Sequence, residues 1–458
     1  MYSFRVTRSD RMTPTRTVLR IFASLATLWA GYFPMLAQAQ ALKVQETILE
    51  NGLKVLLLED HDSPAVTFQV WYRVGSINEQ DGKSGLSHFL EHMMFKGTDK
   101  IGPEEYTRAI AKNGGRSNAF TSTDSTVYFA TMSRDKIGIA IDLEADRMAN
   151  ARLDAAYFEP EKKVVMEERR LRTEDNPASS LGELIGAVAY LVHPYRRPVV
   201  GWMKDIEGLT SDDLKAYYRK YYLPNNAFVV VVGDFSSKEI LEKIRAAFGK
   251  ISPGKKPPPA EVEEPPQSGE RKAVLKKEAE LPLISQAYHA PNLRDADSLP
   301  LEVLQVILAS GRSSRLHEEL VYRKRIARWI DTDYSRVSID PTLFSVTAQV
   351  MPGQIPAEVE KAIDAQLQKV RTEPVSAREL KKAKNQIEAG FIFGQDSIFG
   401  QAMRLGQYET AAGWKLLDGY LPGIRKVTAE DVLRVAQKYL QPDRRTVGTL
   451  VPTKEESR

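Results

Sequence analysis

The feature that most constrains the fold is an internal repeat. The segments Thr210–Pro224 and Thr428–Pro442 each span 14 positions, and an offset of 218 in the numbering relates one to the other. Each opens with Thr followed three positions later by Asp, a pattern typical of a capped helix start, and each leads into an apolar run that is typical of a strand. We therefore expect a duplicated domain of mixed helices and strands, an α+β fold.

The rest of the chain divides around this repeat. The stretch 253–270 is rich in Pro, Glu and Lys and is typical of an extended linker. We expect one domain at 40–252 and a related domain at 271–458. With 458 residues, the chain is long enough for two such domains.

The segment 1–39 is typical of a secretory signal peptide. Basic residues at 5–20 precede an uncharged, mostly apolar stretch at 21–36, and Ala37-Gln38-Ala39 forms a small-x-small cleavage site. An uncleaved anchor helix is the alternative, but Pro34 and the short apolar stretch argue against it. We predict cleavage before Gln40, with Ala39-Gln40-Ala41 as the neighbouring option. We also predict export to a bacterial periplasm, with no membrane span in the mature chain.

Charge and cysteine content exclude several classes of protein. Segment 1–39 holds five arginines and one aspartate, so the remaining chain balances 59 basic with 59 acidic side chains and has no nucleic-acid footprint. The chain has no cysteine, which excludes thiol nucleophiles, disulfides, Cys-ligated zinc and lipoprotein anchors.

The strongest chemical motif is His88-Phe-Leu-Glu91-His92. The stretch from Ser87 to Met93 is expected to be helical, with no Gly or Pro from Leu86 to Lys96, so histidines four apart share one face. Two imidazoles can bind one zinc ion while Glu91 acts on the attacking water, and H-x-x-E-H is the inverzincin signature. The alternative is a pair of helix histidines that cap or pack near a surface.

A second helical stretch carries Glu161 and Glu168 seven positions apart, two turns along one face. A third zinc ligand has to come from a distant part of the chain, and a carboxylate is one of the few types left without cysteine. From composition alone, however, a solvated charged face is the stronger interpretation. In the second copy the offset of 218 places Gln386 at the position of Glu168, and 301–307 contains no histidine. Only the first copy is therefore expected to bind metal.

These motifs stand among others in a fixed order, and together they resemble the pitrilysin/insulinase metallopeptidases. The likeness is to the half-size branch that includes mitochondrial processing peptidases and bacterial periplasmic zinc proteases, and it covers nearly all of the chain after the signal. The matching stretches are 85–98, 118–124 with Tyr128, 161–168 with 174–177, 193–195 with Gly201, and 221–226 with 231–234.

The resemblance implies a role for each residue of the site. His88, His92 and Glu168 would bind one zinc ion per chain, with Glu91 as general base, and the spacing from His92 to Glu168 suits the family's pattern. Glu161 would support the site from outside the ligand set. The His193 position belongs to the family pattern without being a ligand.

The resemblance also implies two homologous domains, each a mixed, mostly antiparallel sheet packed with helices. In such enzymes the peptide substrate adds to an edge strand beside the zinc helix, and that strand would include Asn118, Ala119, Phe120 and Thr121. A plain sheet edge is the alternative.

One departure concerns the second domain. Many relatives carry an Arg and a Tyr seven apart after a Ser-Ser-Arg-Leu stretch, to hold substrate and stabilise the oxyanion. Here Ser313-Ser-Arg-Leu316 is followed by Val321 and Arg328 at those positions. Either Arg328 substitutes in part or another chain supplies the pair. We favour a heterodimer with a related chain that carries the Arg/Tyr pair, and a homodimer is also possible.

The sequence therefore predicts a periplasmic zinc metalloendopeptidase that cleaves peptides or unfolded segments in a chamber closed by two half-size chains. The alternatives are a non-catalytic scaffold or assembly subunit of the same fold, and a zinc-storage or transport protein. Glu91 argues against both, because neither would use a carboxylate beside two histidines.

Overall fold

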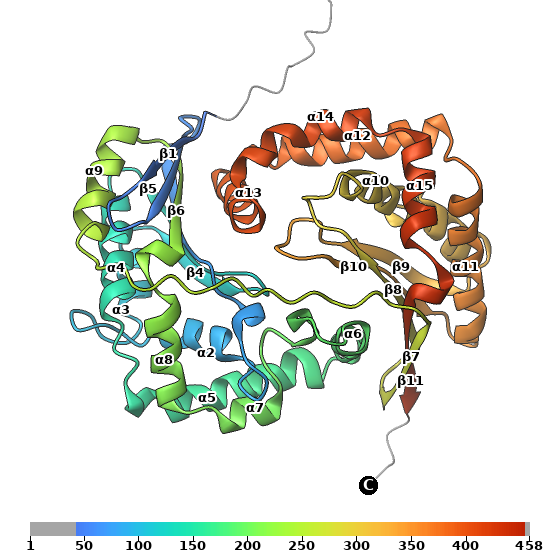
Figure 1. Ribbon diagram of the computed structural model, residues 1–458, viewed down its shortest axis with the longest axis horizontal. Coiled ribbons are helices and arrows are strands. Elements are labelled where there is room, and N and C mark those ends of the chain that lie inside the picture. The colour runs from blue at the N-terminus through green and yellow to red at the C-terminus, as the bar shows by residue number, and fades with distance from the viewer. Residues whose placement is uncertain (1–42, 454–458) are drawn as a thin grey trace, which may run out of the picture. The chain divides into compact units, whose positions relative to one another are not determined.

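The computed structural model describes residues 43–453 and contains two sheets (Figure 1). The first has six strands in the order β1-β2-β6-β3-β5-β4, and the second has five in the order β7-β11-β8-β10-β9. The predicted signal peptide lies outside the described residues. Within 43–453, no helix is both long and apolar enough to cross a membrane.

The first sheet comprises β1 (Gln45–Ile48), β2 (Lys54–Glu59), β3 (Ala65–Tyr72), β4 (Arg116–Thr121), β5 (Thr126–Ser133) and β6 (Ala227–Gly233). The second comprises β7 (Arg271–Glu278), β8 (Leu283–Ala290), β9 (Ala327–Tyr334), β10 (Thr342–Val350) and β11 (Arg445–Thr453).

Each sheet is mixed and mostly antiparallel, which confirms the predicted fold class. In the first sheet only β2 and β6 pair in parallel, and in the second only β7 and β11 do. The central strand β6 is buried at every position, and its Val229–Val232 run suits a strand that is covered on both faces.

The internal repeat is visible as matched elements. Strands β3 and β8 begin at Ala65 and Leu283, and β6 and β11 begin at Ala227 and Arg445, in each case with the same offset of 218. Helices α8 and α15 follow this relation too. Thr210 and Thr428 each form the expected capping box with the Asp three positions later. Local sequence signals therefore specify the same unit twice.

Helices cover both sheets. Those of the first half are α2 (Leu86–Met93), α3 (Glu105–Lys112), α4 (Ile137–Asn150), α5 (Ala155–Arg169), α6 (Pro177–Ala189), α7 (Met203–Gly208), α8 (Ser211–Tyr221) and α9 (Ser237–Phe248). Those of the second half are α10 (Ser298–Ala309), α11 (Pro356–Thr372), α12 (Ala377–Phe393), α13 (Ile398–Ala411), α14 (Tyr420–Lys426) and α15 (Ala429–Tyr439). Helix α2 packs against α5, α8 and β4, so it is held on several sides.

The predicted motif helix is confirmed, since α2 runs from Leu86 to Met93. Beyond it the chain turns sharply through Gly97, whose φ is 103°. A Cβ there would lie 2.6 Å from the Ile101 carbonyl oxygen, so this turn needs glycine. This close approach fixes the turn that follows α2.

Helix α13 belongs to the second half in sequence but packs on the first sheet. Ala402 and Leu405 of α13 share a buried apolar cluster with Trp71 and Phe228. The approach is close, because a Cβ at Gly406 would overlap the Trp71 indole. The first sheet therefore has one face completed by a helix that comes much later in the chain.

A buried ion-pair group reinforces this contact. Glu409 of α13 is only 5% exposed. Its carboxylate lies 2.8 Å from Lys54 Nζ and 2.6 Å from Arg73 Nη2. Two cations from the first half thus compensate the burial of one carboxylate from the second.

The stretch 252–269 contains no helix or strand. It is nevertheless anchored, because Glu264 accepts hydrogen bonds from the backbone N–H groups of Leu191, Val192 and His193 at 2.6, 3.0 and 2.9 Å. These three N–H groups belong to the turn that follows α6.

Candidate metal centre

The start of α2 is fixed by a buried carboxylate that sequence reasoning missed. Glu79 accepts hydrogen bonds from the backbone N–H groups of Gly85 and Ser87, both at 2.8 Å. The carboxylate therefore caps the positive end of the helix. Burial opposes the charged form and raises the pKa of Glu79 to about 8, although both hydrogen bonds favour ionisation.

The two histidines of α2 converge on one carboxylate from α5. His92 Nε2 lies 3.2 Å from Glu168 Oε2, and His88 Nε2 lies 3.6 Å from Glu168 Oε1. Taken together, one potential ligand atom from each residue lies within 4.8 Å of the others. The structure thus brings together the three residues that the sequence predicted as ligands, from two helices that are well separated along the chain.

Glu161 orients one of these histidines. Its carboxylate Oε1 lies 2.9 Å from His92 Nδ1, and its Oε2 lies 2.6 Å from Lys96 Nζ. A carboxylate can only accept here, so His92 Nδ1 carries a proton and donates it to Glu161. In the neutral imidazole, Nε2 would then be the nitrogen available to a metal ion. Burial alone would lower the pKa of His92, but hydrogen bonds to Glu161 and Glu168 raise it to about 9.

The donor set suits a zinc ion. Two imidazole nitrogens and one carboxylate oxygen, with a further position left for water, is the composition of a catalytic zinc site. The two carboxylates, Glu161 and Glu168, lie close to the imidazoles, and their negative charge favours a bound cation. Hydrogen bonds from the histidines hold the pKa of Glu168 well below its usual range. The exposed Arg172 lies 2.7 Å from Glu168 Oε1, on the outer side of the group.

Glu91 stands apart from the three donors and contacts the edge strand. Thr121 Oγ1 donates a hydrogen bond to Glu91 Oε2 at 2.6 Å. Glu91 is half-buried and lies on the same helix as His88 and His92. The structure therefore places a further carboxylate on the helix that supplies two of the three donors.

Strand β4, which carries the predicted substrate-binding residues Asn118, Ala119, Phe120 and Thr121, is an edge strand. It pairs with β5 and lies at the end of the sheet order. In the part of the chain that the structure describes, no strand pairs with its other edge. It also contacts α2, so the open edge borders the helix that carries Glu91.

Arg328 is not part of this cluster. It lies on β9 with its side chain 55% exposed, and its Nη1 lies 3.7 Å from Glu280 Oε2. Val321 lies in a short π-helical stretch, His317–Arg323. Within residues 43–453, Arg328 makes no hydrogen bond or ion pair with His88, Glu91 or their neighbours.

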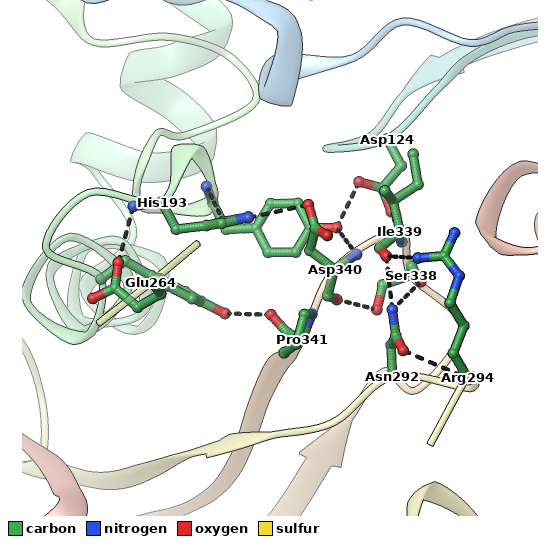
Figure 2. Close-up of polar contacts among 11 residues, drawn as sticks. Asp124, His193, Glu264, Asn292, Arg294, Ser338, Ile339, Asp340 and Pro341 are labelled. Atoms are coloured by element: carbon green, nitrogen blue, oxygen red, sulfur yellow. Dashed lines mark hydrogen bonds and ion pairs between the residues drawn. The ribbon is translucent and has the colours of Figure 1, made fainter. Parts of the chain in front are cut away.

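His193 also lies outside the cluster, in a polar network that joins the two halves (Figure 2). Its Nδ1 accepts a hydrogen bond from the Tyr195 backbone N–H at 3.2 Å, and its Nε2 lies 3.2 Å from Asp340. Asp124 accepts from the Tyr195 hydroxyl at 2.7 Å and from the Ile339 N–H at 2.9 Å. His193 is thus a structural residue that connects the sequence motif to the second half.

The chain is similar to known peptidases over most of its length. The family model described as Insulinase (Peptidase family M16) matches residues 54–201, and the model described as Peptidase M16 inactive domain matches 208–387. The protein named Zinc protease PqqE from Helicobacter pylori is 33% identical over 432 residues, which cover 93% of this chain and 96% of that protein.

Solved structures of peptidases also resemble this chain in fold. The crystal structure of a protease from Helicobacter pylori superposes with a TM-score of 0.87 at 33% identity, covering 90% of this chain and 99% of the other. The structure of the periplasmic protease PqqL from Escherichia coli gives a TM-score of 0.76 at 19% identity, and the match covers 91% of this chain but 48% of that one. This second likeness concerns the fold alone.

Proposed function

Because the chain belongs to the M16 (insulinase) family of peptidases, we propose that it is a zinc-dependent endopeptidase whose ligands are His88, His92 and Glu168. The observation that carries this proposal is the convergence of the three donors on one point, with Glu91 on the same helix as the two histidines. The family's relatives include named zinc proteases, and the donor set of this chain suits that ion.

In this proposal each side chain has a distinct task. A zinc ion supplies the Lewis acidity that makes water a nucleophile near neutral pH. Glu91 takes a proton from that water and returns it to the amine of the leaving peptide. Glu161 holds His92 in the tautomer that keeps Nε2 available, and Thr121 holds the Glu91 carboxylate in place.

We infer that the substrate is an extended peptide that pairs with the open edge of β4. Backbone hydrogen bonds to residues 118–121 would hold many sequences, because they require no particular side chain. The same strand supplies Thr121 to Glu91, so a peptide that pairs there passes beside the general base. Peptides and unfolded segments fit this geometry, because their backbone N–H and C=O groups are free to pair with an edge strand.

We further propose that the enzyme works as two half-size chains that close a chamber in the periplasm. The Escherichia coli periplasmic protease of similar fold is about twice as long as the region matched here. The residues at the Arg/Tyr positions are Val321 and Arg328, so a related partner chain that carries the pair is favoured over a second copy of this chain. The signal-like residues 1–39 support export.

Zinc content and peptide cleavage test the proposal. Residues 40–458 are expressed, bound zinc is measured by elemental analysis, and cleavage of internally quenched peptides is followed by fluorescence. Glu91→Gln should retain zinc and lose activity by about 10²–10⁴-fold, the usual contribution of a general base. The matched control is Glu167→Gln, an exposed carboxylate on α5. Full activity in Glu91→Gln would refute the mechanism.

A pull-down with the tagged chain tests the partner. Peptide cleavage that appears only when a related chain co-purifies would support the heterodimer. Peptide cleavage by the pure chain as a dimer would favour a homodimer instead. Zinc binding without cleavage in every assembly would favour the alternative, a non-catalytic scaffold or assembly subunit of the same fold.

A further inference from the structure

The second half contains a cavity of about 420 Å³ that the proposed peptidase chemistry does not use. It lies between α10 and α12, where the chain leaves β9, and α13 and α14 complete its wall. By the offset of 218, Gln386 in its lining matches Glu168. The α12 wall of the cavity therefore corresponds to the α5 wall of the metal centre in the first half.

A buried guanidinium stands at one wall. Arg336 is 8% exposed, and its Nε lies 2.7 Å from Glu302 Oε2. Its Nη2 donates to the Tyr408 hydroxyl, and its Cζ lies 4.5 Å from the centre of the Tyr420 ring. Tyr420 in turn donates to Glu302 Oε1 at 2.5 Å. One carboxylate and two aromatic rings thus fix Arg336 in a single orientation.

A second guanidinium stands without an anionic partner. Arg404 Cζ lies 4.2 Å from the centre of the Phe391 ring, and its Nη1 donates to the Phe391 carbonyl oxygen at 3.3 Å. Among residues 43–453, no carboxylate forms an ion pair with Arg404. Burial accordingly lowers the pKa of its guanidinium. The cavity therefore holds two guanidinium groups and one carboxylate, an excess of one positive charge.

We propose that this cavity binds a carboxylate of a peptide chain, either a C-terminal carboxylate or an acidic side chain. A guanidinium offers a planar fork that matches a carboxylate with two hydrogen bonds, and Arg404 has no such partner of its own. The walls supplied by Phe391, Tyr408 and Tyr420 would pack against the apolar part of the same residue. The volume exceeds that needed for a bare inorganic anion. The choice of a peptide as the bearer of the carboxylate rests on the proposed peptidase function.

Isothermal titration calorimetry on the zinc-loaded Glu91→Gln chain tests this without cleavage. Three acetylated peptides share one neutral core. One has an internal Glu and an amidated C-terminus, one has a free C-terminal carboxylate, and one is amidated and uncharged. Arg404→Gln should weaken binding of a carboxylate peptide by about tenfold, the effect of losing one charge-assisted hydrogen-bond pair, and leave the uncharged peptide unchanged.

The matched control is Arg378→Gln, an exposed arginine on α12, which should leave all three affinities unchanged. Arg404→Lys keeps the charge without the fork and should give an intermediate loss. Whichever carboxylate peptide responds to Arg404→Gln identifies the source of the carboxylate. Melting temperatures of the variants establish that each has folded.

Two results would overturn the proposal. Equal affinities for all three peptides in the parent and Arg404→Gln chains would exclude a carboxylate site. Binding of inorganic phosphate that depends on Arg404, with no peptide affected, would assign the cavity to a different ligand. Because the readout is binding in an inactive background, failure of the proposed peptidase activity is seen separately in the cleavage assay of the parent chain.

Discussion

Two helix pairs occupy matching places in the two halves, α2 with α5 and α10 with α12. Between the first pair lie two imidazoles and a carboxylate that converge within 4.8 Å. Between the second pair lies a cavity with Glu302 on one helix and Gln386 on the other. The two halves share a backbone framework, while the chemical content between the helices differs.

The difference shows what a metal site demands of its framework. Three donors must be present together, and each must leave a lone pair directed at one point. The matching positions of the second half lack these donors, since α10 contains no histidine and Gln386 is an amide. The cationic groups there are the guanidinium groups of Arg336 and Arg404. The comparison predicts that exchange of Glu and Gln changes zinc binding in the first half and leaves it unchanged in the second.

The largest effect should come from Glu168→Gln. An amide is a poor zinc ligand beside two imidazoles, so we expect zinc affinity to fall by more than about 100-fold, beyond the loss typical of a supporting residue, and cleavage to fall with it. Competition with a chromogenic chelator measures the affinity. Glu167→Gln, one position away and exposed, should match the parent. Unchanged zinc affinity in Glu168→Gln would show that the third ligand is another residue.

Glu161→Gln should weaken zinc binding less than Glu168→Gln does. The amide can still accept from His92 Nδ1, but it carries no charge and no longer pairs with Lys96. Removal of such a supporting carboxylate typically costs about 10–100-fold in metal affinity or activity. The chelator assay and the peptide assay should show the loss together. A variant with normal affinity and normal turnover would mean that Glu161 only packs against the histidine.

Glu79→Gln should change how stability depends on pH. Glu79 has a pKa of about 8 in the folded chain against 4.5 as the ordinary value, so the fold favours its protonated form. That stabilisation is fully present below pH 4.5 and is lost as the pH rises to about 8. Denaturant titrations measure the free energy of unfolding at pH 5 and at pH 8.5. This free energy should be lower at pH 8.5 in the parent, by at most on the order of 4 kcal/mol, and the difference should be smaller in the variant.

The exposed Glu239→Gln serves as the control for that experiment and should keep the parent's pH dependence. An identical decline in Glu79→Gln and the parent would show that Glu79 is ionised in the fold at both pH values. The two N–H groups of Gly85 and Ser87 would then outweigh burial.

The smallest effect should come from Gln386→Glu in the second half. The change restores a carboxylate at the position that matches Glu168, but no imidazole faces it from α10. We expect zinc stoichiometry to stay at the parent's value by elemental analysis. A second zinc ion bound to this variant would contradict the expected difference between the two halves, because it would show that the second half contains enough other ligands to bind zinc.

The fold could be predicted from sequence to the extent that it depends on local signals. The capping boxes at Thr210 and Thr428 and the apolar runs after them marked the repeat, and the matched elements confirm it. The pairing of His88 and His92 follows from helical spacing. Glu168 needed the family resemblance, because spacing alone gives a charged surface as the stronger interpretation.

Other features depend on contacts that no local pattern encodes. Glu79 caps α2 because the loop before the helix folds back on its start. The cavity near Arg336 and Arg404 forms where four helices and the end of one strand meet. The turn after α2 depends on the close approach of the Ile101 carbonyl oxygen to Gly97. In each case the deciding neighbour is set by the tertiary fold.

The placement of α13 on the first sheet bears on how the chain is made. A ribosome releases the first half well before α13 is synthesised, and until then Trp71 and Phe228 lack the apolar cover that Ala402 and Leu405 provide. The carboxylate of Glu409 is likewise absent from Lys54 and Arg73. The two repeats are therefore coupled during folding, and the half that holds His88, His92 and Glu168 is completed last.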